Sequence, residues 1–140
     1  MAGRVAVFAA ALWWGSLSVI GFLVVPMLFA NMPTPAQAGN MAARLFSAQT
    51  WVSTACVGLL LLMSRSRGSD QLHPWAKRLL GFLIGGLLLA LLSEFAVAPR
   101  IVARENLALW HGLGSGMYLL QWVCAGLTLW RLAPASPVSR

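Results

Sequence analysis

Charged residues are scarce in this chain, and acids are the scarcest: Asp70, Glu94 and Glu105 are the three in 140 residues. Charged residues make up 9% of the chain and hydrophobic residues 59%, whereas a soluble globular domain carries about 25% charged residues. This composition excludes an ordinary water-soluble globule. It also leaves no pair of carboxylates within one apolar segment, and no serine, histidine and acid form a recognisable catalytic pattern. We therefore expect no enzymatic activity.

Cysteine and histidine are equally rare. Cys56 and Cys124 lie in separate apolar runs without Cys-x-x-Cys spacing, which gives neither a disulfide framework nor a zinc site. His73 and His111 fall near opposite ends of the expected helices, which argues against haem. Copper is a weak alternative, because thioethers bind Cu(I) but methionine is also a common apolar filler. The methionines concerned are Met27, Met32, Met41 and Met117. We expect no metal and no cofactor.

Four long apolar runs dominate the sequence, at residues 5–30, 45–63, 79–98 and 107–130. At about 1.5 Å per residue, each is long enough to cross a hydrocarbon core of roughly 30 Å. The runs are continuously apolar and do not alternate, so strands are not expected. The sequence predicts an all-α integral membrane bundle of four transmembrane helices. Residues 1–132 form this single domain, and residues 133–140 are expected to be a disordered cytoplasmic tail.

The basic residues give a net charge of +7, but they occur as short clusters between the apolar runs and form no stripe for nucleic acid. Counted near helix ends, seven fall on one side of the membrane and three on the other. The seven are Arg4, Arg65, Arg67, Lys77, Arg78, Arg131 and Arg140; the three are Arg44, Arg100 and Arg104. The positive-inside rule then predicts a cytoplasmic (inner) membrane protein with both termini and the loop from residue 64 to 78 in the cytoplasm. The lipid bilayer is its expected partner, and nucleic acid is not.

Ala36-Gln37-Ala38 before Gly39 offers an alternative reading of the first run, as a cleavable secretory signal. The apolar region of such signals is about 7 to 15 residues long. The run here is longer and contains Trp13-Trp14. We expect the first helix to be retained.

A weak internal repeat relates residues 22–39 to residues 95–112 at an offset of 73, with five identities in 18 positions. Phe22-Leu-Val-Val-Pro26 matches Phe95-Ala-Val-Ala-Pro99. The first and third helices cross in the same direction, so the bundle is a possible parallel two-plus-two repeat; chance similarity of apolar segments is the alternative. Pro26 should kink the first helix or end its regular part. Pro99 is expected to close the third.

Small residues recur at a spacing of four, the pattern that lets helix backbones approach closely in lipid. Their expected role is to pack the helices of the bundle against one another, although one such face could instead form a homodimer. The glycines concerned are Gly15, Gly58, Gly81, Gly85, Gly112 and Gly116.

Glu94 is the one acid inside an apolar run. Counted from the helix ends, His111 and Arg44 fall at a similar depth near the outer surface, with Gln49 about one turn deeper and Arg100 just outside. We expect these five residues to form a polar cluster, since lipid does not tolerate such charges alone. The cluster has two interpretations: it clamps the helices together, or it binds an ion or a small polar ligand. A third possibility is that no cluster exists and Glu94 reaches the interface.

Several short motifs resemble those of the transmembrane-protein-205-like family. They are Trp14-Gly15, Pro26-Met-Leu-Phe29, Ala38-Gly39 with Leu45-Phe46, Pro99-Arg100 and Trp110-His111-Gly112. The resemblance implies a small four-helix membrane protein of unknown function. Eukaryotic relatives carry a Cys-x-x-Cys element proposed to take part in metal handling, which this chain lacks.

The expected function is therefore a structural or accessory role in the membrane. The alternative is an oligomeric transporter or ion-binding protein that uses Glu94 and His111. A homo-oligomer or a membrane-protein partner is compatible with either.

Overall fold

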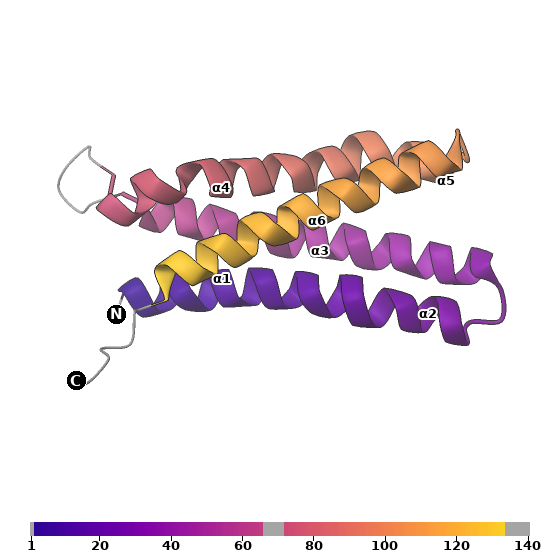
Figure 1. The fold of residues 1–140 in the computed structure, drawn as a ribbon, viewed down its shortest axis with the longest axis horizontal. Coiled ribbons are helices and arrows are strands. Elements are labelled where there is room, and N and C mark those ends of the chain that lie inside the picture. The colour runs from indigo at the N-terminus through magenta and orange to yellow at the C-terminus, as the bar shows by residue number, and fades with distance from the viewer. Residues whose placement is uncertain (1, 66–71, 134–140) are drawn as a thin grey trace.

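The computed structural model describes residues 2–65 and 72–133, and in these ranges it is helical, without a strand. It has four long helical segments (Figure 1). The first comprises α1 (Ala2–Val19), η1 (Ile20–Val24) and α2 (Val25–Asn31); the second is α3 (Pro35–Met63); the third comprises α4 (Pro74–Leu92), η2 (Ser93–Val97) and α5 (Ala98–Val102); the fourth is α6 (Leu107–Leu132). The tail beyond residue 133 and most of the loop between α3 and α4 lie outside the described residues.

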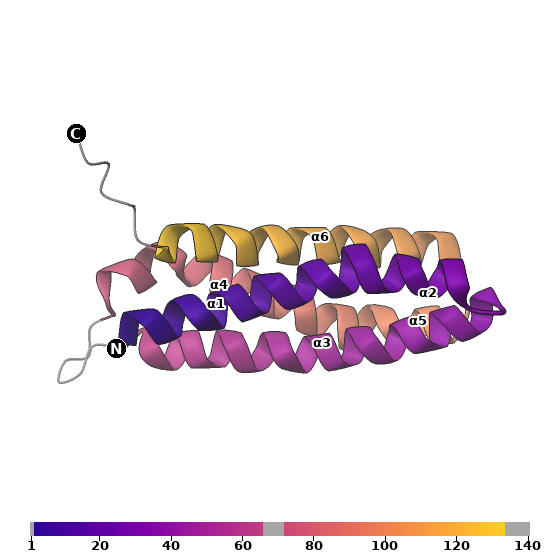
Figure 2. The ribbon, with the colours of Figure 1, turned by 90° about the horizontal axis from the view of Figure 1, so that it is seen from below.

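The four segments lie side by side along the long axis of an elongated bundle (Figures 1 and 2). α1 packs against α3 and α6, and α4 packs against the same two helices. The first and third segments are therefore diagonal partners, as are the second and fourth. The helices α1 and α4 begin at one end of the bundle, here called the near end, and α2 and α5 finish at the other, the far end.

Three of the four helical segments extend past their apolar runs at the far end. α3 begins at Pro35 and not near residue 45, because the Thr34 hydroxyl accepts a hydrogen bond from Gln37 N at 3.3 Å and proline is favoured in the first helical turn. The non-helical connection between the first two segments is confined to Met32–Thr34. Residues 31–44, which separate the first two apolar runs, are therefore mostly helical. Asn106 caps α6 by accepting from Leu109 N at 3.4 Å. Capping therefore moves the start of α3 away from its apolar run, whereas at α6 the cap and the start of the apolar run coincide.

Two π-helical turns interrupt the first and third segments at corresponding places. η1 spans Ile20–Val24 and η2 spans Ser93–Val97, the same offset of 73 residues that relates the sequence motifs. Each is followed by a proline in the next helical turn, Pro26 or Pro99. The helix continues through both prolines, so Pro99 does not close the third segment, which ends at Val102. A π turn makes backbone hydrogen bonds between residues five apart instead of four, and here this change occurs just before a proline, which has no N–H to donate.

The centre of the bundle is closed by large apolar side chains. Trp13 is fully buried, and a Cβ placed on Gly86 of the diagonal segment would lie 2.6 Å from its ring. The glycine therefore makes room for the indole. Positions 13 and 86 are related by the same offset of 73 residues. Towards the near end the core is apolar, with Val57, Leu60 and Leu83 fully buried.

The outer surface of the bundle is apolar as well. Phe8, Leu62 and Trp130 are among many large hydrophobic side chains left exposed, at 74%, 76% and 82%. Three of the four segments are long and apolar enough to cross a membrane: Gly3–Asn31, Pro35–Met63 and Pro74–Val102. The fourth, α6, contains His111 and Gln121, which lower its hydropathy. An apolar core inside an apolar surface is the organisation of a helical membrane protein.

Candidate functional site

A layer of hydrogen-bonded polar side chains crosses the middle of the bundle. Gln49 Nε2 donates to Ser16 Oγ at 3.0 Å and to Ser53 Oγ at 3.2 Å, and Gln121 Nε2 donates to Ser53 Oγ at 2.9 Å. These four residues, here called the mid-bundle polar layer, come from α1, α3 and α6. Gln49, Ser53 and Gln121 are at most 4% exposed. The layer ties three helices together across the diagonal between α3 and α6.

The depth of this layer follows from its neighbours. The third segment runs from Pro74 to Val102, so its middle residue is Leu88. Gly86 faces Cys124 of α6, which places Gln121 within about one helical turn of that middle. In lipid, unpaired polar groups at such a depth are costly, and the hydrogen bonds between helices are worth about 0.6 kcal/mol each on average. The polar layer therefore lies where a bilayer would be driest, and its internal pairing stabilises the bundle.

One acceptor of the layer has no partner among the described residues. Gln49 Oε1 is buried and receives no hydrogen bond. The sequence placed Gln49 in a cluster with Glu94, but its amide points instead to Ser16 and Ser53.

Glu94 lies in η2, one side of which faces α3. Its carboxylate accepts a hydrogen bond from Ser47 Oγ, and its side chain is half-buried. Glu94 is six residues from Leu88, or about 9 Å along the axis. Because half of a hydrocarbon core is about 15 Å, a bilayer centred on Leu88 would enclose this carboxylate. Insertion scales put the cost of a charged residue at the helix centre at about 2.5 to 3.5 kcal/mol.

The remaining members of the expected cluster lie further out. A Cβ on Gly114 would sit 3.4 Å from Val97 and 3.9 Å from Ile101, so His111, three residues closer to the far end, lies beyond the level of Glu94 by roughly two helical turns. The expectation of equal depth is wrong because the third segment continues past residue 98. His111 is exposed and makes no hydrogen bond to Glu94.

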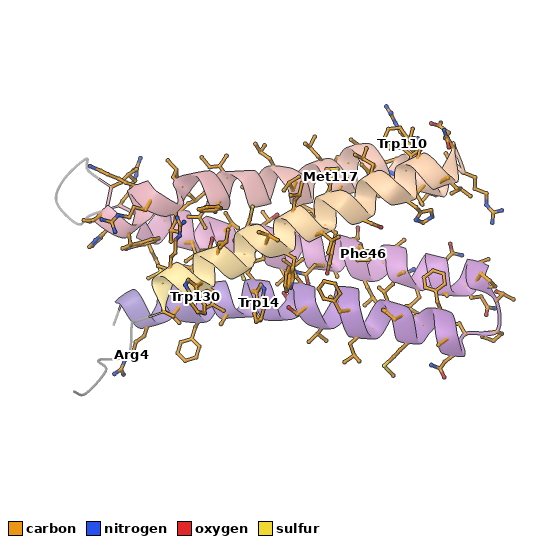
Figure 3. The ribbon with its side chains drawn as sticks, in the orientation of Figure 1. Arg4, Trp14, Phe46, Trp110, Met117 and Trp130 are labelled. Atoms are coloured by element: carbon orange, nitrogen blue, oxygen red, sulfur yellow. The ribbon has the colours of Figure 1, made fainter. Side chains whose placement is uncertain are left out.

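The arginines of the expected cluster are also separate from the carboxylate. The Arg100 guanidinium lies 4.4 Å from the ring centroid of Trp110 at the far end, a cation–π contact (Figure 3). Arg44 is exposed, about one turn outward from Ser47 on α3, and lines a shallow pocket. Within residues 2–65 and 72–133, neither arginine pairs with Glu94.

The π turn of the first segment, η1, lies against the side chain of Tyr118. Tyr118 Oη, from α6, donates to the Leu17 carbonyl at 2.7 Å, and a Cβ on Gly21 would lie 2.4 Å from the tyrosine ring. The π turn and the glycine together admit this ring. The ring of Phe46, on α3 (labelled in Figure 3), lies edge-on to the Tyr118 ring with 5.2 Å between the ring centroids, so the aromatic pair bridges α3 and α6.

The glycines that allow close packing are not those that the spacing indicated. Nothing lies within 4 Å of a Cβ placed on any of Gly15, Gly58, Gly81, Gly85, Gly112 and Gly116. The close approaches are at Gly21, Gly86, Gly114 and Gly126, against Tyr118, Trp13, Val97 and Trp14. Spacing of four places residues on one helix face but does not say whether that face points inward.

Two hollows lie at the far end, and neither includes Glu94 or His111. One has a volume of about 310 Å³ and is lined by Met32, Gln37, Asn40, Met41 and Arg44. The other, of about 560 Å³, is lined by Val24, Met27, Leu28, Asn31, Met32 and Pro33. No group of three or more histidine, cysteine or acidic side chains that could hold a metal occurs in the described parts of the chain.

Five residues of these networks were not anticipated from the sequence: Ser16, Ser47, Ser53, Tyr118 and Gln121. Each is a hydroxyl or amide side chain within an apolar run. Such groups near the middle of a membrane helix need a partner on another helix. A search for uncharged polar residues within the apolar runs would therefore have included these five.

Comparison with the curated proteins and with the solved structures gave no match to this chain. Comparison with protein families gave a match to the family described as "Domain of unknown function (DUF4149)", over residues 8–109. The matched range runs from α1 to the first turn of α6, so it contains both π turns, Glu94 and most of the mid-bundle polar layer. The chain belongs to the DUF4149 family.

Proposed function

We propose that this protein is a small integral membrane protein of the cytoplasmic membrane, with four spans and a structural or accessory role. The mid-bundle polar layer carries the proposal. The amide groups of Gln49 and Gln121 donate hydrogen bonds to serines of other helices. Large buried side chains, Trp13 among them, fill the core beside the layer. A permeation route would require polar groups facing an open space. Here they serve as contacts between helices.

The fourth span and the orientation are part of the proposal. α6 has 26 residues, about 39 Å at 1.5 Å per residue, which exceeds the core of roughly 30 Å. It packs against both α1 and α4. The near end carries Arg4, Lys77, Arg78 and Arg131, and the positive-inside rule places that end in the cytoplasm.

Labelling of introduced cysteines in intact cells tests the span count and the orientation. Gly3→Cys and Arg131→Cys, at the near end, should react with a membrane-impermeant maleimide only after the cells are opened, whereas Gln37→Cys at the far end should react at once. The parent chain is the control, because Cys56 is buried and Cys124 half-buried within the bundle. Labelling of Gly3→Cys and Arg131→Cys on opposite sides would contradict an even number of spans.

The accessory role requires a surface for another membrane protein or a second copy. The pairs Gly81 with Gly85 and Gly112 with Gly116 leave backbone open on α4 and α6, and such pairs let helices approach in lipid. Oxidative crosslinking of Gly112→Cys in native membranes should therefore give a disulfide-linked adduct, and Val5→Cys on an exposed face of α1 should not. Absence of an adduct at Gly112→Cys would count against the α6 face, and absence of an adduct at Gly81→Cys would count against the α4 face.

The ancestry of the family is also proposed here. The coincidence of η1 and η2 at the repeat offset supports a parallel two-plus-two duplication. The motifs around Pro26, Pro99 and Trp110 support a relation between this chain and the transmembrane-protein-205-like family.

A further inference from the structure

We infer that Glu94, at the η2 turn, is a binding site for a single monovalent cation, either a proton or Na⁺. The inference rests on the proposed membrane insertion and goes beyond the proposed structural role. Its starting point is the environment of the carboxylate. Glu94 lies inside the expected hydrocarbon core, and its partner in the structure is a neutral hydroxyl, that of Ser47.

The groups that face Glu94 do not neutralise it. From α3, Arg44 is exposed and about one turn further out; from α5, Arg100 lies over Trp110. From α6, Tyr118 is bonded to the Leu17 carbonyl and His111 lies beyond the level of the site. The basic residues of α4, Lys77 and Arg78, are at the near end. A carboxylate in lipid without a cationic side chain requires a bound cation to be neutral.

The backbone of η2 adds a second, independent observation. Ala98 N donates to the Ser93 carbonyl, which is an i→i−5 bond. The next carbonyl in this register is that of Glu94, and its donor would be residue 99, a proline without an N–H. The Glu94 carbonyl is thus left without a donor in that register. Interrupted helices in transporters use such carbonyls to coordinate Na⁺ or to accompany a proton site, and π turns are frequent at functional sites.

A third observation is the hydroxyl group of Ser93, which is buried and has no hydrogen-bond partner within the described residues. It adjoins Glu94 in the sequence. The η2 turn therefore carries carboxylate, carbonyl and hydroxyl oxygens at one level of the bundle, and the contact that the structure shows at the carboxylate is the Ser47 hydroxyl of α3. Oxygen ligands suit a hard cation, and the absence of thiolate or imidazole among them distinguishes this site from a soft-metal site.

Carbodiimide labelling tests the inference on the full chain in lipid vesicles. Dicyclohexylcarbodiimide, which partitions into lipid, reacts with a protonated carboxyl group: the acid proton moves to a carbodiimide nitrogen, the carboxylate oxygen bonds to the central carbon, and the adduct rearranges to a stable N-acylurea. Mass spectrometry of peptides should locate the adduct at Glu94, with less labelling as the pH rises. If Na⁺ is also a ligand, NaCl should reduce labelling relative to an equal concentration of choline chloride; if the proton alone binds, the two salts should give equal labelling.

Two controls keep the result interpretable. Glu94→Gln should abolish the adduct while the far-ultraviolet circular dichroism keeps its helical signal, and exposed Glu105 should react with a water-soluble carbodiimide instead. Absence of an adduct at Glu94 over the whole pH range, in a chain that cysteine mapping shows to be inserted, would overturn the cation site and leave the structural role standing.

Discussion

Substitution of Gly86 by alanine should destabilise the bundle, although alanine is the better helix former. The added Cβ would lie 2.6 Å from both Trp13 Cη2 and Trp13 Cζ2, well inside van der Waals contact. Trp13 is fully buried, so its ring has no free space to enter. Overpacking of this kind costs about 1 to 3 kcal/mol, and the intrinsic gain from replacing glycine is about 1 kcal/mol. We expect a net loss of up to about 2 kcal/mol.

The neighbouring glycine supplies the matched control. Nothing lies within 4 Å of a Cβ at Gly85, so Gly85→Ala should leave the free energy of unfolding unchanged or slightly higher. Both variants can be measured by reversible unfolding in mixed detergent micelles, with helicity followed by circular dichroism. In a double-mutant cycle, Trp13→Leu should relieve the cost of Gly86→Ala. Equal stability of the Gly85→Ala and Gly86→Ala proteins would refute the contact between the two diagonal segments.

Two further variants test the polar networks. Gln121→Leu keeps the side-chain volume but removes the 2.9 Å bond to Ser53, and the same unfolding assay should show a loss of about 0.6 kcal/mol; unchanged stability would mean that the bond contributes nothing in the folded bundle. Tyr118→Phe removes the 2.7 Å bond to the Leu17 carbonyl, so we expect a loss of about 1 kcal/mol and faster hydrogen exchange at the Gly21 amide. Exchange that is accelerated equally throughout α1 would argue against a local role at the π turn.

The sequence was informative about the helices because lipid imposes one requirement, a long apolar run, that composition alone displays. All four runs are helical. Their ends were less predictable, since they depend on single side chains. Thr34 caps a helix that begins ten residues before its apolar run, and the third segment continues past Pro99 to Val102, whereas α6 begins at Leu107, as expected. Hydropathy records neither effect.

The side-chain contacts were harder to anticipate, because they depend on which face of each helix points inward. Gly81 and Gly85 match the spacing for close packing but face outward, whereas Gly86 makes the contact. Glu94 and His111 were expected to meet because the depth of Glu94 was counted from a helix end at residue 98. The third segment in fact ends at Val102. Glu94 stands out in the sequence as the one acid inside an apolar run. Its partner in the structure, Ser47, carries no charge, so a search for charged partners does not find it.

The Trp13 and Gly86 pair has a consequence for the history of the molecule. The two residues stand at corresponding positions and meet across the bundle, so a symmetric ancestor would have brought each residue against its own copy. Two tryptophans would overfill that space and two glycines would leave a void. Under the proposed duplication, once one half had a large residue here and the other a small one, neither half could be replaced by a duplicate of its neighbour, and the fused chain would be the unit on which selection acts.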